Sequence, residues 1–238
     1  MKQLGQLFDI QYVEFTDTVM SEGLSQWIKK LMQTGGVCCG ITHQLFTDLS
    51  LSEVEIQKRT RRTNKYNISK GNEDYEVNVY DENTTNLPTY FSDFHKFHAS
   101  VAGRETRNQL TWDIQLQGIE YGSDTVGRSF LIFIRDKQTK ELAGAALFDT
   151  TFTHGLYCVA AYDRSRFSKP VGHVIQAYAM GKMRSLGIRW YEIGERPYIT
   201  DRNSNQKIVD IGHYKEGFAT HTFLKIYIGL SLQNSSLN

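Results

Sequence analysis

Residues 170–194 have the sequence PVGHVIQAYAMGKMRSLGIRWYEIG. Apolar side chains recur in it at helical spacing up to Leu186. Pro170 suits the first turn of a helix, and Gly187 suits its end. The next residues, 188–194, are typical of a strand. The sequence therefore predicts a long helix that leads directly into a strand.

Strand signals lie on both sides of this helix. Apolar and polar side chains alternate in residues 75–80, and two apolar runs, 129–135 and 141–151, flank a polar turn. A further strand is expected at 155–162 and a last one at 218–232. Several strands around one helix predict a mixed sheet, largely antiparallel, with helices packed on it and an α/β (α+β) fold class.

Helical patterns precede most of these strands. An aromatic helix is expected from Pro88 to a stop at Gly103, and a second helix over 112–119. Nearer the N-terminus, helices are expected over 24–33 and 52–62, with a strand at 37–42 between them. This arrangement predicts an N-terminal subdomain of residues 1–70 and a larger domain of residues 71–238.

The composition is that of an ordinary globular protein. The 238 residues include 27 Lys and Arg against 26 Asp and Glu, and 40% of them are hydrophobic. A nearly balanced charge argues against a scaffold that coats DNA and against an acidic tail. The three cysteines form no C-x-x-C pair, and no apolar run is long enough to cross a bilayer. We therefore expect a soluble, cytoplasmic protein with no membrane span.

Common catalytic motifs are missing from the sequence. It contains no phosphate-binding P-loop, no dinucleotide-binding glycine motif, no H-E-x-x-H zinc motif and no G-x-S-x-G elbow. His95 and His98 lie three residues apart, but they share a helix face with Phe91 and Phe94, so a packed role is favoured over a metal site. No metal is predicted.

Basic side chains provide candidate anion sites. Arg104 and Arg107 follow Gly103 and could hold a phosphate or a carboxylate; the alternative is an ordinary ion pair, for example with Glu105. The basic residues between Lys58 and Lys65 are either a solvated helix face or a contact for an anionic substrate.

Aromatic and charged residues also surround the strand at 155–162. Tyr157, Tyr162 and Arg164 lie at this strand and at the loop that leads to the long helix. Helix N-termini supply free N–H groups for phosphate, so this loop could receive a pyrophosphate, or it could be a plain connection. Cys158 reads as a buried thiol rather than a nucleophile.

The strand at 188–194 ends in two candidate acids. Glu192 and Glu195 flank its end, and a carboxylate facing a cleft there could take a proton from an ammonium group. Because side chains alternate along a strand, Glu192 and Glu195 point to opposite faces, so only one of them is expected to face a substrate. Each could equally form a surface ion pair.

Together these segments resemble one family. Their order resembles that of the FemAB-like acyltransferases, which belong to the GCN5-related N-acetyltransferase (GNAT) superfamily. The resemblance rests on Arg59-x-Arg61-Arg62, Phe94-His95-x-x-His98, Gly103-Arg104-x-Thr106-Arg107, Thr111-Trp112, Gly144, Tyr157, Tyr162-Asp163-Arg164, His173, Gly187 to Gly194 and Ile211 to Phe218.

The resemblance implies a GNAT-like fold and transfer of an acyl or aminoacyl group to an amine, in cell-envelope or polysaccharide biosynthesis. The implied acceptor is an amino group of a small-molecule or lipid-linked sugar or peptide precursor. The resemblance implies catalytic roles for Tyr157, Glu192 and Lys215, although a bound water could replace Glu192 as the base. It implies substrate binding by Arg104, Arg107, Trp112, Tyr162, Arg164 and Phe218, and binding of the acyl donor by Cys158, Val159, Ala160, Gly172 and His173.

The implied acyl donor is acyl-CoA or aminoacyl-tRNA, and no tightly bound cofactor is expected. Residues 165–173 keep only Gly172 of the glycine-rich acetyl-CoA loop that is usual in the superfamily. Two alternatives therefore stay open. One is aminoacyl-tRNA-dependent transfer to a peptide precursor, and the other is a catalytically inactive binding module with the same fold.

Overall fold

The computed structural model describes residues 12–20, 23–122, 127–166, 168–201 and 204–232. They form two compact units, which are interleaved along the chain. The larger unit comprises Phe46–Gly194 and Tyr214–Thr220, and the smaller one the described parts of Met1–Leu45, Glu195–His213 and His221–Asn238. The boundary expected at residue 70 lies inside the larger unit, and the division into domains of 1–70 and 71–238 stays a prediction.

A mixed sheet forms the centre of the larger unit. Its strands are β3 (Tyr75–Tyr80), β4 (Phe130–Asp136), β5 (Leu142–Thr150), β6 (His154–Tyr162) and β7 (Trp190–Glu195). Neighbouring strands from β3 to β6 pair antiparallel, and β6 pairs parallel with β7. The structure thus confirms the predicted α/β class with a largely antiparallel sheet.

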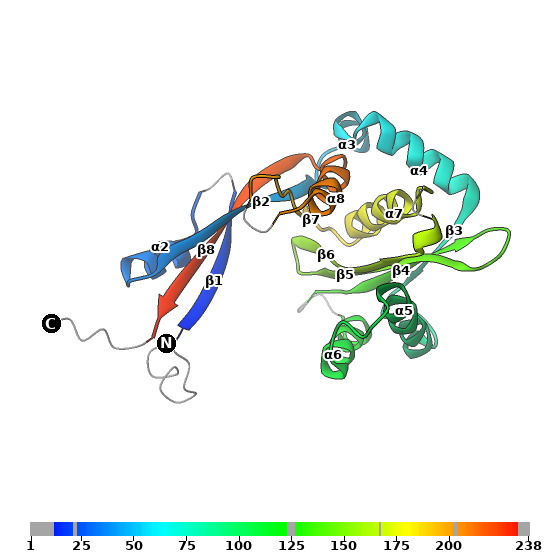
Figure 1. Ribbon diagram of the computed structural model, residues 1–238, viewed down its shortest axis with the longest axis horizontal. Helices are drawn as coiled ribbons and strands as arrows, with labels where there is room; N and C mark the ends of the chain where they lie inside the picture. Colours follow the sequence, from blue (N-terminus) through cyan, green and yellow to red (C-terminus); the bar gives the residue numbers. More distant parts are fainter. Residues whose placement is uncertain (1–11, 21–22, 123–126, 167, 202–203, 233–238) are drawn as a thin grey trace. The chain divides into compact units, whose positions relative to one another are not determined.

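Helices cover both faces of this sheet (Figure 1). One face carries α7 (Val171–Ser185), whose buried side chains include Val174, Ile175 and Met183. The other face carries α5 (Leu87–Ala102) and α6 (Gln109–Glu120). Phe91, Phe94 and Trp112 of these helices pack with apolar residues of β4, β5 and β6 in one core. Two buried layers explain why β4 and β5 are apolar on both sides.

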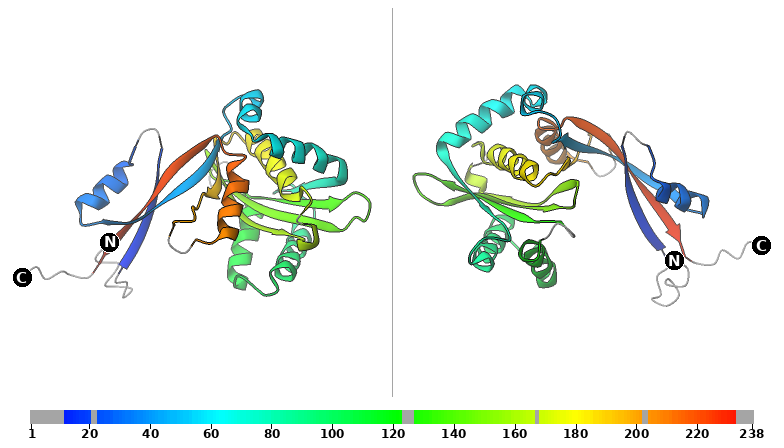
Figure 2. Two further views of the ribbon diagram at one scale, coloured as in Figure 1. Left: turned by 45° about the horizontal axis from the view of Figure 1, so that its top comes forward. Right: turned by 180° about the vertical axis from the view of Figure 1, so that it is seen from behind.

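A further helical layer lies outside α7. It consists of α3 (Glu53–Arg59) and α4 (Arg62–Asp74). Figure 2 shows α4 running along α7, on the side away from the sheet. The two helices approach closely, since a Cβ at Gly71 of α4 would stand 2.3 Å from Val174. The expectation of one helix over residues 52–62 is therefore wrong in its extent. Thr60 is extended, with φ −63° and ψ 131°, and it separates α3 from α4.

The smaller unit is built on an antiparallel strand pair. β1 (Tyr12–Val19) pairs with β8 (His221–Ser231), and α2 (Gln26–Gln33) packs Ile28 and Leu31 against Ile226 and Ile228 of β8. β2 (Val37–Asp48) begins in this unit and ends in the larger one. So does α8 (Gln206–Glu216). Among the described residues, no helix is both long and apolar enough to cross a membrane.

Candidate functional site

The sheet of the larger unit opens between β6 and β7. The two strands pair only over His154–Leu156 and Trp190–Glu192. Beyond these three pairs, β6 continues to Tyr162 while paired with β5 alone. The backbone groups on the β7 side of this half of β6 are therefore outside the ladder. Open sheets commonly bind ligands beyond the carboxyl ends of their strands.

A β-bulge at Cys158 sets the side chains along this opening. Tyr157 lies opposite Phe148 and Val159 lies opposite Leu147, so Cys158 is an extra residue in β6. Side chains five positions apart in a regular strand point to opposite faces. The bulge instead brings Tyr157 and Tyr162 to the same face, where their hydroxyl oxygens lie 2.5 Å apart.

The two tyrosines are neutral hydrogen-bonding groups. Burial raises the pKa of Tyr157 well above its usual value, and burial also raises the pKa of Tyr162 to about 12. Phe148 stacks on the Tyr157 ring, with centroids 5.5 Å apart. At physiological pH both phenols keep their protons, so this site offers O–H donors rather than a phenolate base.

Lys215 enters this region from the end of α8. Its Nζ lies 5.5 Å from the centroid of the Tyr157 ring, a cation–π geometry. A Cβ on Gly194 would stand 2.5 Å from the same Nζ, so the glycine makes room for the ammonium group. Gly194 also has φ +127°, which L side chains rarely adopt.

Glu192 lies two residues before Gly194 on β7. Tyr191 and Ile193 are buried, whereas Glu192 is half-buried. Glu192 pairs with Leu156, the neighbour of Tyr157, so its side chain points to the face of the sheet opposite to that of Tyr157. Its carboxylate raises the pKa of His154, although burial has the larger effect and lowers that pKa overall. Of the predicted catalytic residues, the structure brings Tyr157 and Lys215 into contact, and it places Glu192 on the other face of the sheet from Tyr157.

An aromatic cluster borders the site at the first turn of α7. The His173 ring lies edge-on to Tyr214, with centroids 5.0 Å apart, and 5.8 Å from the buried Phe218. Burial lowers the pKa of His173 to about 4, so the ring is neutral near pH 7. Asn67 Nδ2 lies 3.2 Å from its Nε2. Since an amide nitrogen only donates, Nε2 accepts and the ring proton is on Nδ1.

Tyr214 covers Gly172 at this helix end. A Cβ on Gly172 would stand 2.8 Å from the Tyr214 hydroxyl oxygen. That hydroxyl is buried, and it has no hydrogen-bond partner among the described residues. The space beside Gly172, expected from the resemblance to receive the acyl donor, therefore contains a tyrosine side chain.

Other predicted residues lie on the opposite face of the sheet. Cys158 packs with Trp112 and the α5 aromatics, and its Sγ donates to Asp149 at 2.8 Å. Arg107 lies over the Trp112 ring at 5.4 Å. Val159 is buried in the same core, so its side chain is packed there. These residues are separated by the sheet from the pair Tyr157 and Tyr162.

Two predicted arginines are exposed. Arg104 follows α5, and Arg164 lies in the short η1 helix (Arg164–Arg166). Arg164 borders a shallow pocket with Asp163 and the end of α5. Glu105 contacts His95 at 2.8 Å, so the structure pairs Glu105 with this histidine. Ala160 is half-buried in β6.

Several residues of the site are not among those predicted from the sequence. Tyr191 donates to the buried Gln176 of α7, and Asn67 reaches His173 from α4. Tyr214 is next to Lys215 in the segment from Ile211 to Phe218, so its position in the sequence could have pointed to it. Asn67 lies in the polar helix α4, where nothing in the sequence marks it as a site residue. Across the described parts of the chain, no three His, Cys, Asp or Glu side chains lie close enough to hold a metal.

Proteins with a similar fold are found among solved structures. No protein-family model and no curated protein sequence matches the chain. Among solved structures, FemX aligns with a TM-score of 0.68 and 13% identity, over 97% of this chain and 74% of FemX. The C-terminal domain of a putative lysylphosphatidylglycerol synthetase from Agrobacterium fabrum aligns at 0.64 and 10%, over 98% and 71%. A tandem GNAT protein from the clavulanic acid biosynthesis pathway aligns at 0.52 and 13%, over 98% and 68%.

These alignments span nearly the whole chain. Because the sequence identities are low, the alignments show a shared fold and nothing more. They confirm the fold implied by the resemblance of the sequence. The chain has the FemAB-like form of the GNAT fold.

Proposed function

We propose that this protein is an N-acyltransferase, which moves an acyl or aminoacyl group to an amino group of a cell-envelope sugar or of a peptidoglycan or polysaccharide precursor. The observation that carries the proposal is the opening between β6 and β7, with Lys215 at its edge. Three parallel pairs hold the strands together, and Tyr157, Tyr162 and Lys215 then line the place where they part.

This arrangement suits attack of an amine on a thioester or an ester. Attack turns the carbonyl oxygen into an oxyanion, which needs donors already in place. Backbone N–H groups on the unpaired side of β6 can supply them, and the Lys215 ammonium adds positive charge. Burial among Phe148 and the tyrosines lowers the local dielectric, so each such contact is stronger than it would be in water.

The attacking amine must first lose a proton. Glu192 serves as the base in this proposal, through a water bound in the opening, because it lies two residues before Gly194, at the end of β7 where Lys215 Nζ stands. After the C–N bond forms, the thiol or hydroxyl of the donor leaves with a proton. Holding the two substrates together supplies much of the remaining acceleration.

The proposed donor is an acyl-CoA or an aminoacyl-tRNA. The Tyr214 side chain beside Gly172 narrows the space at the start of α7, where acetyl-CoA is expected to bind. This favours aminoacyl-tRNA over acyl-CoA as the donor. A relative of like fold is named for making lysylphosphatidylglycerol, an aminoacylated lipid. Exposed Lys58 and Arg62, near the junction of α3 and α4, offer a basic surface for RNA. We propose that the reaction takes place in the cytoplasm, on a soluble or lipid-linked acceptor.

A ligand screen with a turnover assay tests the proposal. Acyl-CoAs, nucleotide sugars and aminoacyl-tRNAs are each tested for a rise in the unfolding temperature, since a ligand of the folded state stabilises it. Mixtures of donor and amino-sugar or peptide acceptor are then analysed for acylated product by mass spectrometry. We expect a donor that both stabilises the protein and yields product. Binding of a nucleotide sugar with no product from any donor would instead identify a binding module and overturn the proposal.

The two donor classes are separated by salt dependence. Binding of aminoacyl-tRNA should weaken steeply as the salt concentration rises, because phosphate contacts release counterions. Lys58→Ala with Arg62→Ala should reduce that slope. Binding of acyl-CoA unaffected by both substitutions, with no tRNA retained at low salt, would assign acyl-CoA as the donor.

A further inference from the structure

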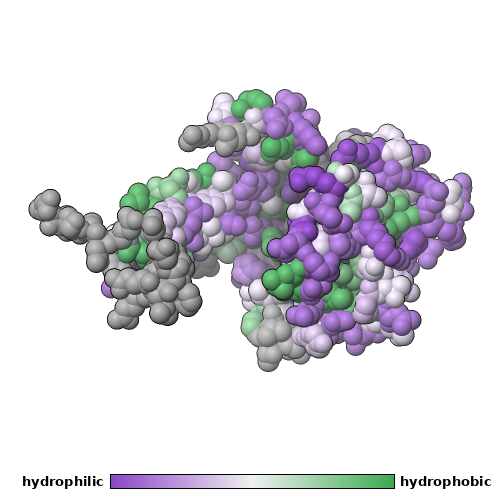
Figure 3. Space-filling view, turned by 60° about the horizontal axis from the view of Figure 1, so that its bottom comes forward, coloured by the Kyte–Doolittle hydropathy of each residue, from purple (hydrophilic) through white to green (hydrophobic). Residues whose placement is uncertain are grey.

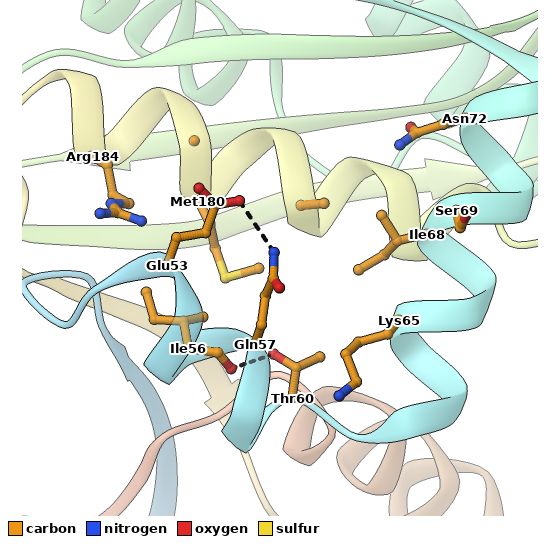
Figure 4. Close-up of a pocket in the computed structure, with 12 residues that line it drawn as sticks. Glu53, Ile56, Gln57, Thr60, Lys65, Ile68, Ser69, Asn72, Met180 and Arg184 are labelled. Atoms are coloured by element: carbon orange, nitrogen blue, oxygen red, sulfur yellow. Dashed lines mark hydrogen bonds between the residues drawn. The ribbon is translucent and has the colours of Figure 1, made fainter.

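A cavity of about 630 Å³ lies between α3, α4 and α7, on the side of α7 away from the sheet (Figure 4). It lies apart from the residues assigned to transfer chemistry, none of which lines it. Its volume is typical of small-molecule sites. A second, more open pocket shares Asn72, Ala177 and Gly181 with it, so the hollow continues along α7 toward β3.

The cavity combines an apolar floor with cations at its rim. Ile56, Ile68 and Met180 provide the floor. Lys65 and Arg184 also line it, and neither has a carboxylate within ion-pair distance in the part of the chain that the structure describes. The one acid of the lining, Glu53, accepts a hydrogen bond from Gln57 at 3.2 Å. The lining is thus complementary to an apolar group that carries a negative charge.

Gly181 is the second sign of a ligand. Glycine within a helix costs about 1 kcal/mol relative to alanine, so it needs a structural reason. Packing gives none, because a Cβ at Gly181 would meet no atom within 4 Å, and its φ is not positive. With Ala177 one turn earlier, Gly181 instead leaves the cavity open along α7.

We propose that this cavity binds a small amphipathic anion, a single apolar chain that ends in a phosphate or a carboxylate. The chain lies on Ile68 and Met180 and over Gly181, and the anionic group binds Lys65. Figure 4 shows Lys65 pointing toward Thr60 and Gln57, at the α3–α4 end of the cavity. Arg184, on α7, adds a more distant positive charge. This inference goes beyond the proposed transfer reaction and does not depend on it.

The position of α4 gives such a ligand a route to the candidate active site. Lys65, Ile68 and Ser69 face the cavity, whereas Asn67 between them contacts His173 of the aromatic cluster. Both sites therefore share one helix as a wall. An occupant of the cavity acts on the same turn of α4 that holds His173.

The test uses calorimetric titration of the full chain below the micellar concentration of each probe. Decyl phosphate and decanoate should bind, whereas decanol lacks the charge and inorganic phosphate lacks the chain, so both should bind at least about tenfold more weakly. Decyl phosphate against decanoate distinguishes a phosphate from a carboxylate ligand. Inorganic phosphate binding as tightly as decyl phosphate would overturn the proposal.

Variants locate the binding. Lys65→Met should weaken decyl phosphate about tenfold, Arg184→Met less, and Lys70→Met, on the same helix outside the cavity, not at all. Glu53→Gln should tighten it by removing a negative charge. Gly181→Leu should abolish binding with no fall in the unfolding temperature, because its Cβ has space and leucine favours helix. Undiminished binding to a folded Gly181→Leu protein, or equal losses for Lys65→Met and Lys70→Met, would refute the site.

Discussion

The ammonium nitrogen of Lys215 lies over Gly194, only 2.5 Å from the point where a Cβ would stand. The end of β7 is thus shaped to admit a cation, with the Tyr157 ring on another side of the same Nζ. The ammonium group can occupy this position because residue 194 is a glycine. A side chain introduced at residue 194 therefore tests the position of the charge.

Gly194→Ala should therefore displace Lys215 and reduce turnover. The new Cβ meets Nζ, and the backbone at φ +127° is strained for alanine by about 1 to 3 kcal/mol. Urea unfolding and kcat are measured for Gly194→Ala alone and in a Lys215→Ala background. In that background the collision disappears and only the strain remains, so the stability loss should shrink. An equal loss in both backgrounds would show that Nζ does not occupy this space.

Lys215→Ala by itself should lower kcat by about 10² to 10³, as is usual when one oxyanion donor is removed. KM should change little, because in the proposed mechanism the charge acts mainly in the transition state. Lys207→Ala, an exposed lysine on the same helix, is the matched control and should keep full activity. A normal kcat for a folded Lys215→Ala protein would remove Lys215 from the mechanism.

The effect of Gly172→Ala on stability should change sign when Tyr214 is replaced by phenylalanine. Gly172→Ala alone should destabilise by about 1 to 3 kcal/mol through overpacking, because its Cβ would lie 2.8 Å from the Tyr214 hydroxyl. Tyr214→Phe removes that oxygen, and the nearest ring atom is then 3.4 Å away. In this background Gly172→Ala should stabilise, since alanine favours helix. If the effects of the two substitutions on the free energy of unfolding in urea were simply additive, the contact between residue 172 and the Tyr214 hydroxyl would be contradicted.

His173 should make the folded protein sensitive to acid. The unfolded chain protonates this histidine near pH 6.5, whereas the folded protein does so only near pH 4. The unfolded state thus binds more protons between these values, so the free energy of unfolding falls as the pH drops through this window. Allowing for partial exposure, the loss is about 1 to 2 kcal/mol.

His173→Gln removes this titration, and its unfolding free energy should depend less on pH between 6.5 and 4. His213→Gln, at an exposed histidine, is the control and should follow the parent protein. Identical pH curves for the parent and His173→Gln would show that the ring is not held neutral by burial.

Cys158 should be unreactive in the folded protein. Burial, followed by the Asp149 carboxylate, raises the pKa of its thiol well above the usual value, and thiol reagents attack the thiolate. Cys38 and Cys39 are exposed. Native protein should therefore release two equivalents of chromophore from a disulfide reagent, and a third only after unfolding. Cys158→Ser should keep the native count at two, and a native count of three would place this thiol in solvent.

Regular periodicity made much of the larger unit predictable. The pattern up to Leu186 corresponds to α7, and the aromatic helix from Pro88 to Gly103 corresponds to α5. Both helices bury one apolar stripe, which a sequence shows directly. By contrast α4 was missed beyond residue 62, because its buried residues are Asn64 and Gly71 and it has no apolar stripe.

The candidate site was harder to read than the fold. Strict alternation places Tyr157 and Tyr162 on opposite faces, and only the bulge at Cys158 brings their hydroxyls together. An extra residue in a strand leaves no mark in the hydrophobic pattern. The resemblance pointed to Lys215 as a site residue. Its close approach to Gly194, however, depends on α8, a helix that was not predicted from the sequence.

The return of residues 214–220 to the larger unit has a consequence for biosynthesis. Proteins are made from the N-terminus, and their domains begin to fold during synthesis. The sheet and its flanking helices are complete at Gly194, but Lys215 and Phe218 follow only after residues 195–213 have been added to the smaller unit. A nascent chain can thus hold a folded sheet with no cation at its opening until residues 195–215 have been synthesised.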